Sequence, residues 1–381
     1  MAVDPAREAG ITAEFIGLES PGADRSGAGG HPCQGVYYYR EGTSPRVALI
    51  ATHYNIDFSE HYLAGFIAAR GMGFLGWNTR YRGAEAYFRL DGALVDIDAG
   101  VRWLRARGVE CVVLLGNSGG GSLMAAYQSQ AAAPTLTPEY GRSAVSSAVR
   151  SLATADLYVS LAAHPGRAEV LTNWMDPSVT DETDPLSVDS ELDPYRADRQ
   201  PPFDEPFVAA YRAAQRARNQ RITAWCRGEI DRMAAAGHYD RLFVVPRLWA
   251  DLRMVDGSID PSNRPVPACY LGDPRRANYG MFGVGTVSSL RTWLSMWSLS
   301  DSQCGVAQLR RVNVPALVID ADADTGIFLS DTARIVSALR DRPDAPPVDT
   351  FTLAADHYLL NPPGARAEVA DLITDWIRGQ L

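Results

Sequence analysis

The sequence contains no lysine: all 36 of its basic residues are arginine, and the net charge is −9. Reactions that proceed through a lysine Schiff base or a lysine general base are therefore excluded. The excess of negative charge argues against nucleic acid as a partner, because phosphate backbones select clustered positive charge. The five cysteines are scattered and none forms a CxxC pair. They predict neither a disulfide framework nor a zinc site, and reduced thiols fit a cytosolic protein.

The sequence also lacks any long apolar run. No stretch approaches the roughly 18 uninterrupted apolar residues that span a bilayer, so no membrane partner is expected. Residues 1–10 lack the basic-then-apolar order of a secretory signal, and a cytoplasmic location is the default expectation. Apolar residues nevertheless make up 46% of the 381 residues, enough for a sizeable core in one α/β domain that carries a large insertion.

Short apolar segments alternate with helix-like segments over the first 165 residues and again near the C-terminus. Buried strands are predicted at residues 47–52, 72–78, 112–115, 157–162, 315–319 and 348–353. Helices are predicted at residues 58–70, 91–107, 118–127, 330–339 and 369–377. Such alternation implies right-handed crossovers, and the fold class is α/β with a mostly parallel, doubly wound sheet.

The alternation of predicted strands and helices is interrupted between residues 166 and 303. Residues 176–204 are rich in Asp, Pro and Ser and predict irregular structure, whereas residues 206–233 predict one long helix. A loop-rich, aromatic stretch follows. The simplest organisation is an α/β core of residues 1–165 and 304–381, with a mainly helical cap of residues 166–303 inserted before a later strand of the sheet.

The most informative motif is Gly-Asn-Ser-Gly-Gly at residues 116–120, between a predicted strand and a predicted helix. In this setting G-x-S-x-G places the serine on a cramped turn, where side chains at Gly116 or Gly120 would clash. Ser118 then projects from the sheet edge as a nucleophile. The N–H of Gly119 points at the oxyanion that forms when the serine attacks a carbonyl. A glycine-rich turn, phosphate-binding or merely structural, is the alternative interpretation of the pentapeptide.

A serine nucleophile needs a histidine base and an acid that orients the histidine. His357 lies in A-A-D-H-Y, between the last predicted strand and the last helix, where the base is expected. The loop after the strand at residues 315–319 offers Asp320, Asp322 and Asp324. Asp324 is favoured because it lies farthest into the loop, and Asp322 is the alternative.

These motifs, G-N-S-G-G after a strand, A-D-A-D after a later strand and A-D-H-Y near the C-terminus, resemble the α/β-hydrolase superfamily. The resemblance covers about residues 45–165 and 305–381. It implies a triad formed by the serine, aspartate and histidine named above, with no metal and no organic cofactor. The family's acid commonly closes a G-x-x-D turn, and here Ala321 replaces that glycine. The insertion falls where family members often carry a lid or cap.

A departure from the family pattern concerns the oxyanion hole. After its third strand the family usually has His-Gly, whereas this chain has Thr52-His53-Tyr54-Asn55, with tyrosine in place of the flexible glycine. By position, the N–H of Tyr54 or of Asn55 completes the hole with Gly119, and the choice between them stays open. His53 is expected to brace the loop rather than to act in catalysis.

Further candidates for substrate binding are His164, which precedes the insertion, and Trp293 and Trp297 in the aromatic part of the cap. Arg80, like Arg82, follows a predicted strand whose end faces the site. Either arginine can hold a substrate carboxylate as a bidentate donor, although a structural salt bridge is the favoured alternative. The aromatic cap suggests a mid-sized, mostly apolar substrate.

The resulting hypothesis is a serine hydrolase that cleaves an ester, lactone or thioester through an acyl-enzyme on Ser118. One alternative is a carbon–carbon bond hydrolase or acyltransferase that uses the same residues. Another is a non-catalytic protein that binds a small molecule on this fold, and the intact serine, aspartate and histidine weigh against it. The expected partner is a small-molecule substrate. The sequence leaves the oligomeric state open, a homo-oligomer included.

Overall fold

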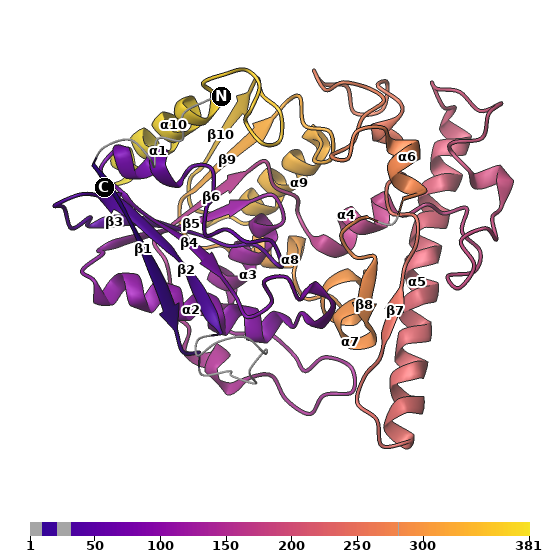
Figure 1. Ribbon diagram of the computed structural model, residues 1–381, viewed down its shortest axis with the longest axis horizontal. Helices are drawn as coiled ribbons and strands as arrows, with labels where there is room; N and C mark the ends of the chain where they lie inside the picture. The colour runs from indigo at the N-terminus through magenta and orange to yellow at the C-terminus, as the bar shows by residue number, and fades with distance from the viewer. Residues whose placement is uncertain (1–9, 21–31, 281) are drawn as a thin grey trace.

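The computed structural model describes residues 10–20, 32–280 and 282–381, and a central sheet forms its core (Figure 1). Eight strands form this sheet in the order β1-β2-β4-β3-β5-β6-β9-β10. They are β1 (Ile11–Leu18), β2 (Cys33–Arg40), β3 (Val47–Ala51), β4 (Gly73–Asn78), β5 (Cys111–Asn117), β6 (Leu157–Leu161), β9 (Ala316–Ala321) and β10 (Val348–Leu353). β2 pairs antiparallel with β1 and β4, and the other neighbours are parallel. The predicted mostly parallel sheet is confirmed.

Helices cover both faces of the sheet, because side chains along the central strands alternate between two apolar clusters. In β3, Leu49 and Ala51 point into one cluster, whereas Ala48 and Ile50 point into the other. The first cluster packs under α1 (Ala64–Ala69) and α10 (Ala365–Gln380). The second packs under α2 (Leu90–Ala106), α3 (Gly120–Ala132), α8 (Val306–Leu309) and α9 (Leu329–Arg340). Burial on both faces explains why the parallel strands are continuously apolar.

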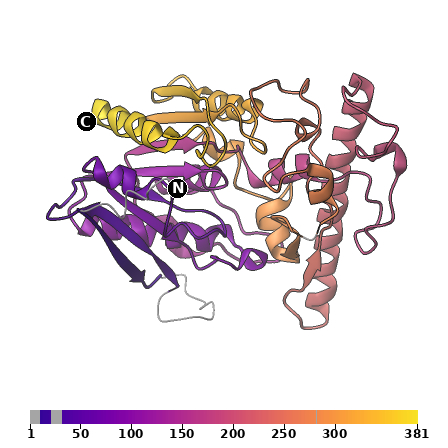
Figure 2. The ribbon, with the colours of Figure 1, turned by 45° about the horizontal axis from the view of Figure 1, so that its top comes forward.

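The segment between β6 and α8 forms a separate layer beside one end of the sheet, as Figures 1 and 2 both show. Its elements are α4 (Arg167–Trp174), α5 (Glu205–Ala235), β7 (Leu242–Val244), α6 (Pro274–Asn278), β8 (Val287–Ser289) and α7 (Leu290–Thr292). The predicted long helix is confirmed as α5, whose first turn is capped by Asp204 accepting from the N–H of Phe207 at 2.8 Å. Long irregular stretches connect these elements. We refer to this segment as the cap.

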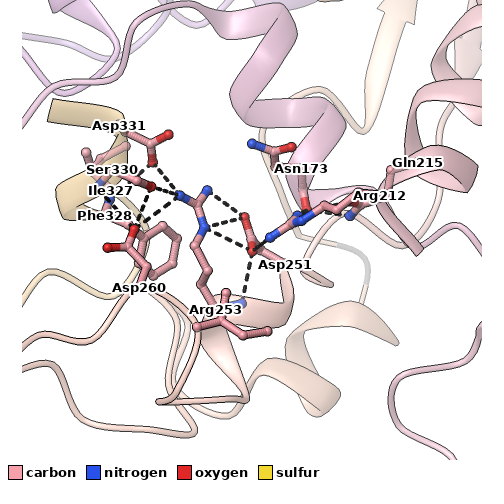
Figure 3. A network of polar contacts seen from close by, with 12 residues as sticks. Asn173, Arg212, Gln215, Asp251, Arg253, Asp260, Ile327, Phe328, Ser330 and Asp331 are labelled. Carbon is pink, nitrogen blue, oxygen red and sulfur yellow. Dashed lines mark hydrogen bonds and ion pairs between the residues drawn. The ribbon is translucent and has the colours of Figure 1, made fainter. Parts of the chain in front are cut away.

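A buried ion-pair network ties the cap to α9 (Figure 3). The guanidinium of Arg253 donates to Asp251 at 2.8 Å and to Asp331, in the first turn of α9, at 3.2 Å. Arg212 of α5 also donates to Asp251, at 2.7 Å. Burial acts to raise the pKa of Asp251, but the charges of Arg212 and Arg253 outweigh it and hold the pKa below its usual range. Because removing one partner leaves a charge buried and unpaired, the network fixes this part of the cap firmly.

Two local predictions differ from the structure. No strand is predicted before residue 47, yet β1 and β2 form an antiparallel hairpin at the sheet edge, where β1 is only partly buried. The helix predicted at residues 58–70 shrinks to α1. The N–H of His61 donates to the carbonyl of Phe58 at 3.1 Å and closes a turn, and the N–H of Leu63 donates to His61 Nδ1 at 3.2 Å instead of to a helical carbonyl. No helix among the described residues is long and apolar enough to cross a membrane. Residues 1–9, part of the stretch used to judge a secretory signal, lie outside the described residues.

Candidate active site

Ser118 lies in the short turn between β5, which ends at Asn117, and α3, which begins at Gly120. Its backbone φ is 53°, in the left-handed region, which costs a residue with a side chain about 1 kcal/mol or more. The N–H of Ser118 donates to the carbonyl of Leu161 at 3.1 Å, and its carbonyl accepts from the N–H of Gly121 at 3.2 Å. Neighbouring backbone therefore holds the serine in a strained conformation, as at many functional sites.

Glycine is required around this turn because the backbone passes very close to its neighbours. A Cβ at Gly116 would lie 2.5 Å from the Cα of Gly121. A Cβ at Gly120 would lie 2.3 Å from the carbonyl oxygen of Thr52. In both places the obstacle is backbone, which cannot swing aside as a side chain does. The predicted clashes at positions 116 and 120 are confirmed.

Asp324 and His357 lie on the loops that follow β9 and β10, at the same edge of the sheet as the serine turn. Asp324 Oδ2 accepts from His357 Nδ1 at 2.5 Å. The other carboxylate oxygen accepts from the N–H of Gly326 at 2.9 Å and of Ile327 at 3.0 Å. The loop backbone thus fixes the carboxylate, and the carboxylate in turn fixes the imidazole. Within the part of the chain that the structure describes, Nε2 of this imidazole makes no hydrogen bond.

The three candidate acids differ in what they contact. Asp322 is half-buried and accepts from the side chain of Asn263 at 2.6 Å, and Asp320 lies within β9. Asp324 is buried and contacts His357, so the aspartate farthest into the loop is the one that reaches the histidine.

Tyr270 of the cap contacts both members of this pair. Its hydroxyl donates to Asp324 Oδ1 at 2.9 Å and lies 3.0 Å from His357 Nδ1, and its ring packs on the imidazole with centroids 4.4 Å apart. Burial and the charge of Asp324 raise the pKa of Tyr270, so its hydroxyl stays protonated and able to donate. The sequence around Tyr270 does not predict this contact. The aromatic residues near Tyr270 in the sequence are the one signal that marks this stretch as part of the site.

A cavity of about 430 Å³ lies between the cap and the sheet edge, and Ser118 and His357 both line it. Trp174 and Trp249 of the cap form part of its wall, with stacked rings whose centroids are 4.8 Å apart. Among the hydrogen bonds of the described residues, none joins the Ser118 hydroxyl to His357. Catalytic hydrogen bonds in ligand-free sites are often long and shorten only when substrate binds. The cavity size fits a small-molecule ligand.

The strand order and the three loops together decide the fold. Ser118 follows β5, Asp324 follows β9 and His357 follows β10, which is the chain order serine, aspartate, histidine. The serine lies on a strained turn between a parallel strand and a helix. The protein has the α/β-hydrolase fold.

No protein-family model and no curated protein matches the sequence. Solved structures similar to this chain include an esterase domain from Rhodothermus marinus, with 12% identity and a TM-score of 0.46 over 96% of this chain and 98% of that one. The α/β hydrolase GrgF from a Penicillium species has 9% identity and a TM-score of 0.49 over 96% and 97%. Brefeldin A esterase, a bacterial homologue of human hormone-sensitive lipase, has 11% identity and a TM-score of 0.47 over 99% and 78%. At these identities and TM-scores, none of these structures assigns an activity or a substrate to this chain.

The serine turn and the loop after β3 meet at one side of the cavity. Gly119 and His53 line the cavity there, and a Cβ on Gly119 would lie 2.6 Å from His53 Nε2. The described lining includes neither Tyr54 nor Asn55. The Tyr54 side chain is fully buried, and its hydroxyl bonds to a serine of α3 at 3.1 Å. Which backbone N–H of this loop would complete an oxyanion hole stays a prediction.

Further histidines line the cavity beside His357. Burial lowers the pKa of His53, His61 and His164, that of His61 to about 4. The positive charge of Arg167 lowers the pKa of His53 and His164 further. These imidazoles are therefore neutral at pH 7. His164 Nδ1 is buried without a hydrogen-bond partner, and a role of His164 in substrate binding remains a prediction.

The remaining candidates lie away from the described lining of this cavity. Arg80 forms a buried ion pair with Asp96 at 2.5 Å, which is the structural alternative considered for it. Trp293 is fully buried, and its Nε1 donates to a threonine of α5 at 3.0 Å. Trp297 is fully buried, and its ring lies 5.3 Å from the guanidinium of Arg167. Arg80, Trp293 and Trp297 are thus engaged in packing and pairing inside the protein, and their contact with a substrate stays a prediction.

Arg167 is a cavity residue that the sequence analysis does not single out. Arg167 begins α4, three residues after His164. The strand before it, β6, ends at the edge of the sheet where Ser118 lies. That position is the one sequence signal that points to it. In the ranges that the structure describes, no group of three His, Cys, Asp or Glu side chains is arranged to hold a metal ion.

Proposed function

We propose that the protein is a serine hydrolase that cleaves an ester, lactone or thioester of a mid-sized, mostly apolar substrate. The observation that carries this proposal is the 2.5 Å hydrogen bond between Asp324 and His357 beside a cavity that Ser118 also lines. A buried carboxylate that holds Nδ1 of an imidazole is the arrangement that prepares Nε2 to act as a base.

In the first half of the proposed reaction, His357 Nε2 takes the hydroxyl proton as Ser118 Oγ attacks the carbonyl carbon. Asp324 stabilises the imidazolium that forms, without taking up the proton itself. The N–H of Gly119 and an N–H of the Tyr54–Asn55 loop stabilise the oxyanion. Loss of one such donor raises the barrier by about 3 kcal/mol. When the tetrahedral species collapses, the imidazolium gives its proton to the leaving oxygen or sulfur.

In the second half, water attacks the acyl-enzyme, and the same base takes a proton from the water. The resulting tetrahedral species expels the serine oxygen, which regains its proton from the imidazolium. The stacked rings of Trp174 and Trp249 offer an apolar wall for the rest of the substrate. No cofactor enters these steps.

Labelling with a fluorophosphonate tests the proposal directly. Mass spectrometry is expected to locate the adduct on Ser118 in the wild type, and the Ser118→Ala variant is expected to remain unlabelled. Hydrolysis of aryl esters or thioesters, abolished by the same substitution, would support the proposed reaction class. A wild type that neither reacts with the probe nor turns over any ester would favour a binding protein. Preferential cleavage of diketones, or transfer to added alcohols, would favour the carbon–carbon hydrolase or the acyltransferase.

A further inference from the structure

The mouth of the active-site cavity is apolar and open to solvent. Among the described residues that line the cavity, four large apolar or aromatic side chains are about half-exposed or more. They are Ile56 at 50%, Tyr358 at 48%, Leu271 at 52% and Phe282 at 80% exposure. They come from the loop after β3, the loop after β10 and two stretches of the cap, and we call them the rim. Apolar side chains that gather at a surface in this way commonly mark a place where something apolar binds.

The rim side chains of the cap stand on anchored backbone. Leu271 lies in a tight turn, in which the N–H of Cys269 donates to the carbonyl of Gly272 at 2.8 Å and the N–H of Gly272 donates to the carbonyl of Cys269 at 2.9 Å. The carbonyl of Phe282 accepts from Trp249 Nε1 at 2.9 Å. The exposure of these two side chains therefore follows from the fold and not from a loose loop.

Aromatic rings connect the buried wall of the cavity to the rim. Trp174 and Trp249 are each only 5% exposed. The ring of Tyr270 packs edge-on against both, with centroids 6.0 and 6.2 Å away. The same ring lies 6.0 Å from the ring of Tyr358, a rim residue. One apolar surface therefore runs from the buried part of the cavity to the outside of the protein.

Three kinds of occupant can cover the rim: a protein surface, a lipid surface or a part of the substrate itself. A stable protein interface takes about 20 to 30 residues on each side, far more than the four of the rim. A lipid surface would meet the exposed carboxylates of Asp57 and Glu60, which line the same mouth, whereas proteins that lie on membranes usually present basic side chains there. A part of the substrate meets neither obstacle, because it reaches the rim directly from the cavity.

We propose that the substrate carries an extended aliphatic chain that leaves the cavity and lies across the rim. This inference rests on the proposed function and narrows its substrate class to esters, lactones or thioesters whose chain is longer than the cavity holds. Each methylene taken fully out of water favours binding by about fourfold. A chain on the rim is covered on one side only, so a gain of about twofold per methylene is expected there.

Two series of substrates test the proposal in the wild type. p-Nitrophenyl alkanoates lengthen the acyl side, and S-alkyl thioacetates lengthen the leaving side. In at least one series, kcat/KM is expected to rise about tenfold between chains of eight and twelve carbons, at concentrations where the substrate is dissolved as single molecules. Flat values beyond eight carbons in both series would overturn the proposal. A rate that rises only where the substrate begins to aggregate would mean that the rim docks on a lipid surface, which overturns it as well.

The Phe282→Ser variant tests whether the rim itself binds the chain. It removes the most exposed rim side chain and leaves the backbone carbonyl that Trp249 binds. The ratio of kcat/KM for the twelve-carbon substrate to kcat/KM for the four-carbon substrate of the preferred series is expected to fall about fivefold. An unchanged ratio would contradict the proposal.

Leu186→Ser is the matched control for this variant. Leu186 also belongs to the cap and is 83% exposed, but it is not part of the described lining of the cavity. The control is expected to keep the ratio within about twofold of the wild type, because exposed side chains away from a site rarely affect it. A fall of the same size in both variants would mean that the ratio does not report contact with the rim, and the proposal would be lost. Thermal unfolding verifies that both variants are folded.

Binding to the inactive Ser118→Ala variant separates this proposal from the proposed function. In calorimetry, 1-decanol is expected to bind at least about tenfold more tightly than 1-hexanol, and Phe282→Ser in the same background is expected to narrow this difference. That result in a protein whose wild-type serine never reacts would refute the hydrolase and keep the role of the rim. A protein that labels on Ser118 but binds both alcohols equally would keep the hydrolase and refute the role of the rim.

Discussion

Replacing Asp324 by asparagine separates the orienting role of the carboxylate from its role in packing. Oδ1 accepts from the N–H groups of Gly326 and Ile327 and from the Tyr270 hydroxyl, at 2.9 to 3.0 Å. Oδ2 accepts from His357 Nδ1 alone. Asparagine has the same shape, and its oxygen is expected to keep the three donors because an amide nitrogen cannot accept them. The amide nitrogen must then face the imidazole.

The expected loss of kcat in this variant follows from which ring nitrogen of His357 carries the proton. An amide N–H pointing at Nδ1 requires Nδ1 to accept, which puts the imidazole proton on Nε2. Nε2 then cannot take the proton of Ser118. In serine proteases the equivalent change lowers kcat by about 10⁴-fold, or about 5 kcal/mol of barrier. The fold loses one charge-assisted hydrogen bond, so the free energy of unfolding is expected to fall by only about 1 to 3 kcal/mol.

Steady-state hydrolysis of an aryl ester measures kcat, and thermal unfolding measures stability in the same preparation. Asp322→Asn is the matched control, because that half-buried carboxylate bonds to Asn263 and not to the histidine. The control is expected to change activity by less than about twofold. The reasoning would be refuted if Asp324→Asn kept more than a tenth of the wild-type activity, or if Asp322→Asn lost as much.

Three further predictions concern the cap, the serine turn and the buried ion pairs. Tyr270→Phe removes a hydroxyl bonded to the acid, and kcat is expected to fall about tenfold while KM stays unchanged; an unchanged kcat would contradict this. Gly120→Ala drives a Cβ to 2.3 Å from a backbone oxygen. It is expected to lower the unfolding free energy by about 3 kcal/mol or more, measured by urea titration. Gly228→Ala, a helical position with open space, serves as control and is expected to stabilise by about 1 kcal/mol. The lowered pKa of Asp251 means that its carboxylate stabilises the fold above about pH 4, and that this contribution fades as the pH falls further. The difference in unfolding free energy between wild type and Asp251→Asn is therefore expected to narrow from about pH 7 to about pH 3. A constant difference would contradict a lowered pKa of Asp251 in the folded protein.

Local signals in the sequence were sufficient for the parts of the fold that depend on neighbours along the chain. The run at residues 112–115 predicts a buried strand because both faces of a parallel sheet are covered. The glycines around Ser118 predict a tight turn because the clashes that they avoid come from backbone close by. The aspartate that reaches the histidine follows from loop length, since Asp324 lies farthest from the end of β9.

Contacts between distant parts of the chain could not be predicted in this way. Tyr270 meets His357 across 87 residues, and Arg167 meets His53 across 114. No local pattern encodes such pairs, because they depend on how the cap settles on the sheet edge. The same holds for the segment before α1, where the N–H of Phe58 donates to the side chain of Asn78, 20 residues away.

Under the proposed function, the position of Tyr270 gives the cap a role beyond that of covering the substrate. A residue from the most variable kind of element, an insertion in a loop-rich region, donates a hydrogen bond to the pair that would handle the proton. Any exchange of this insertion for another, in evolution or in protein engineering, would alter the chemistry along with the specificity unless a phenol returned to the same place. Shifts of the insertion during substrate uptake or product release would likewise reach the histidine directly.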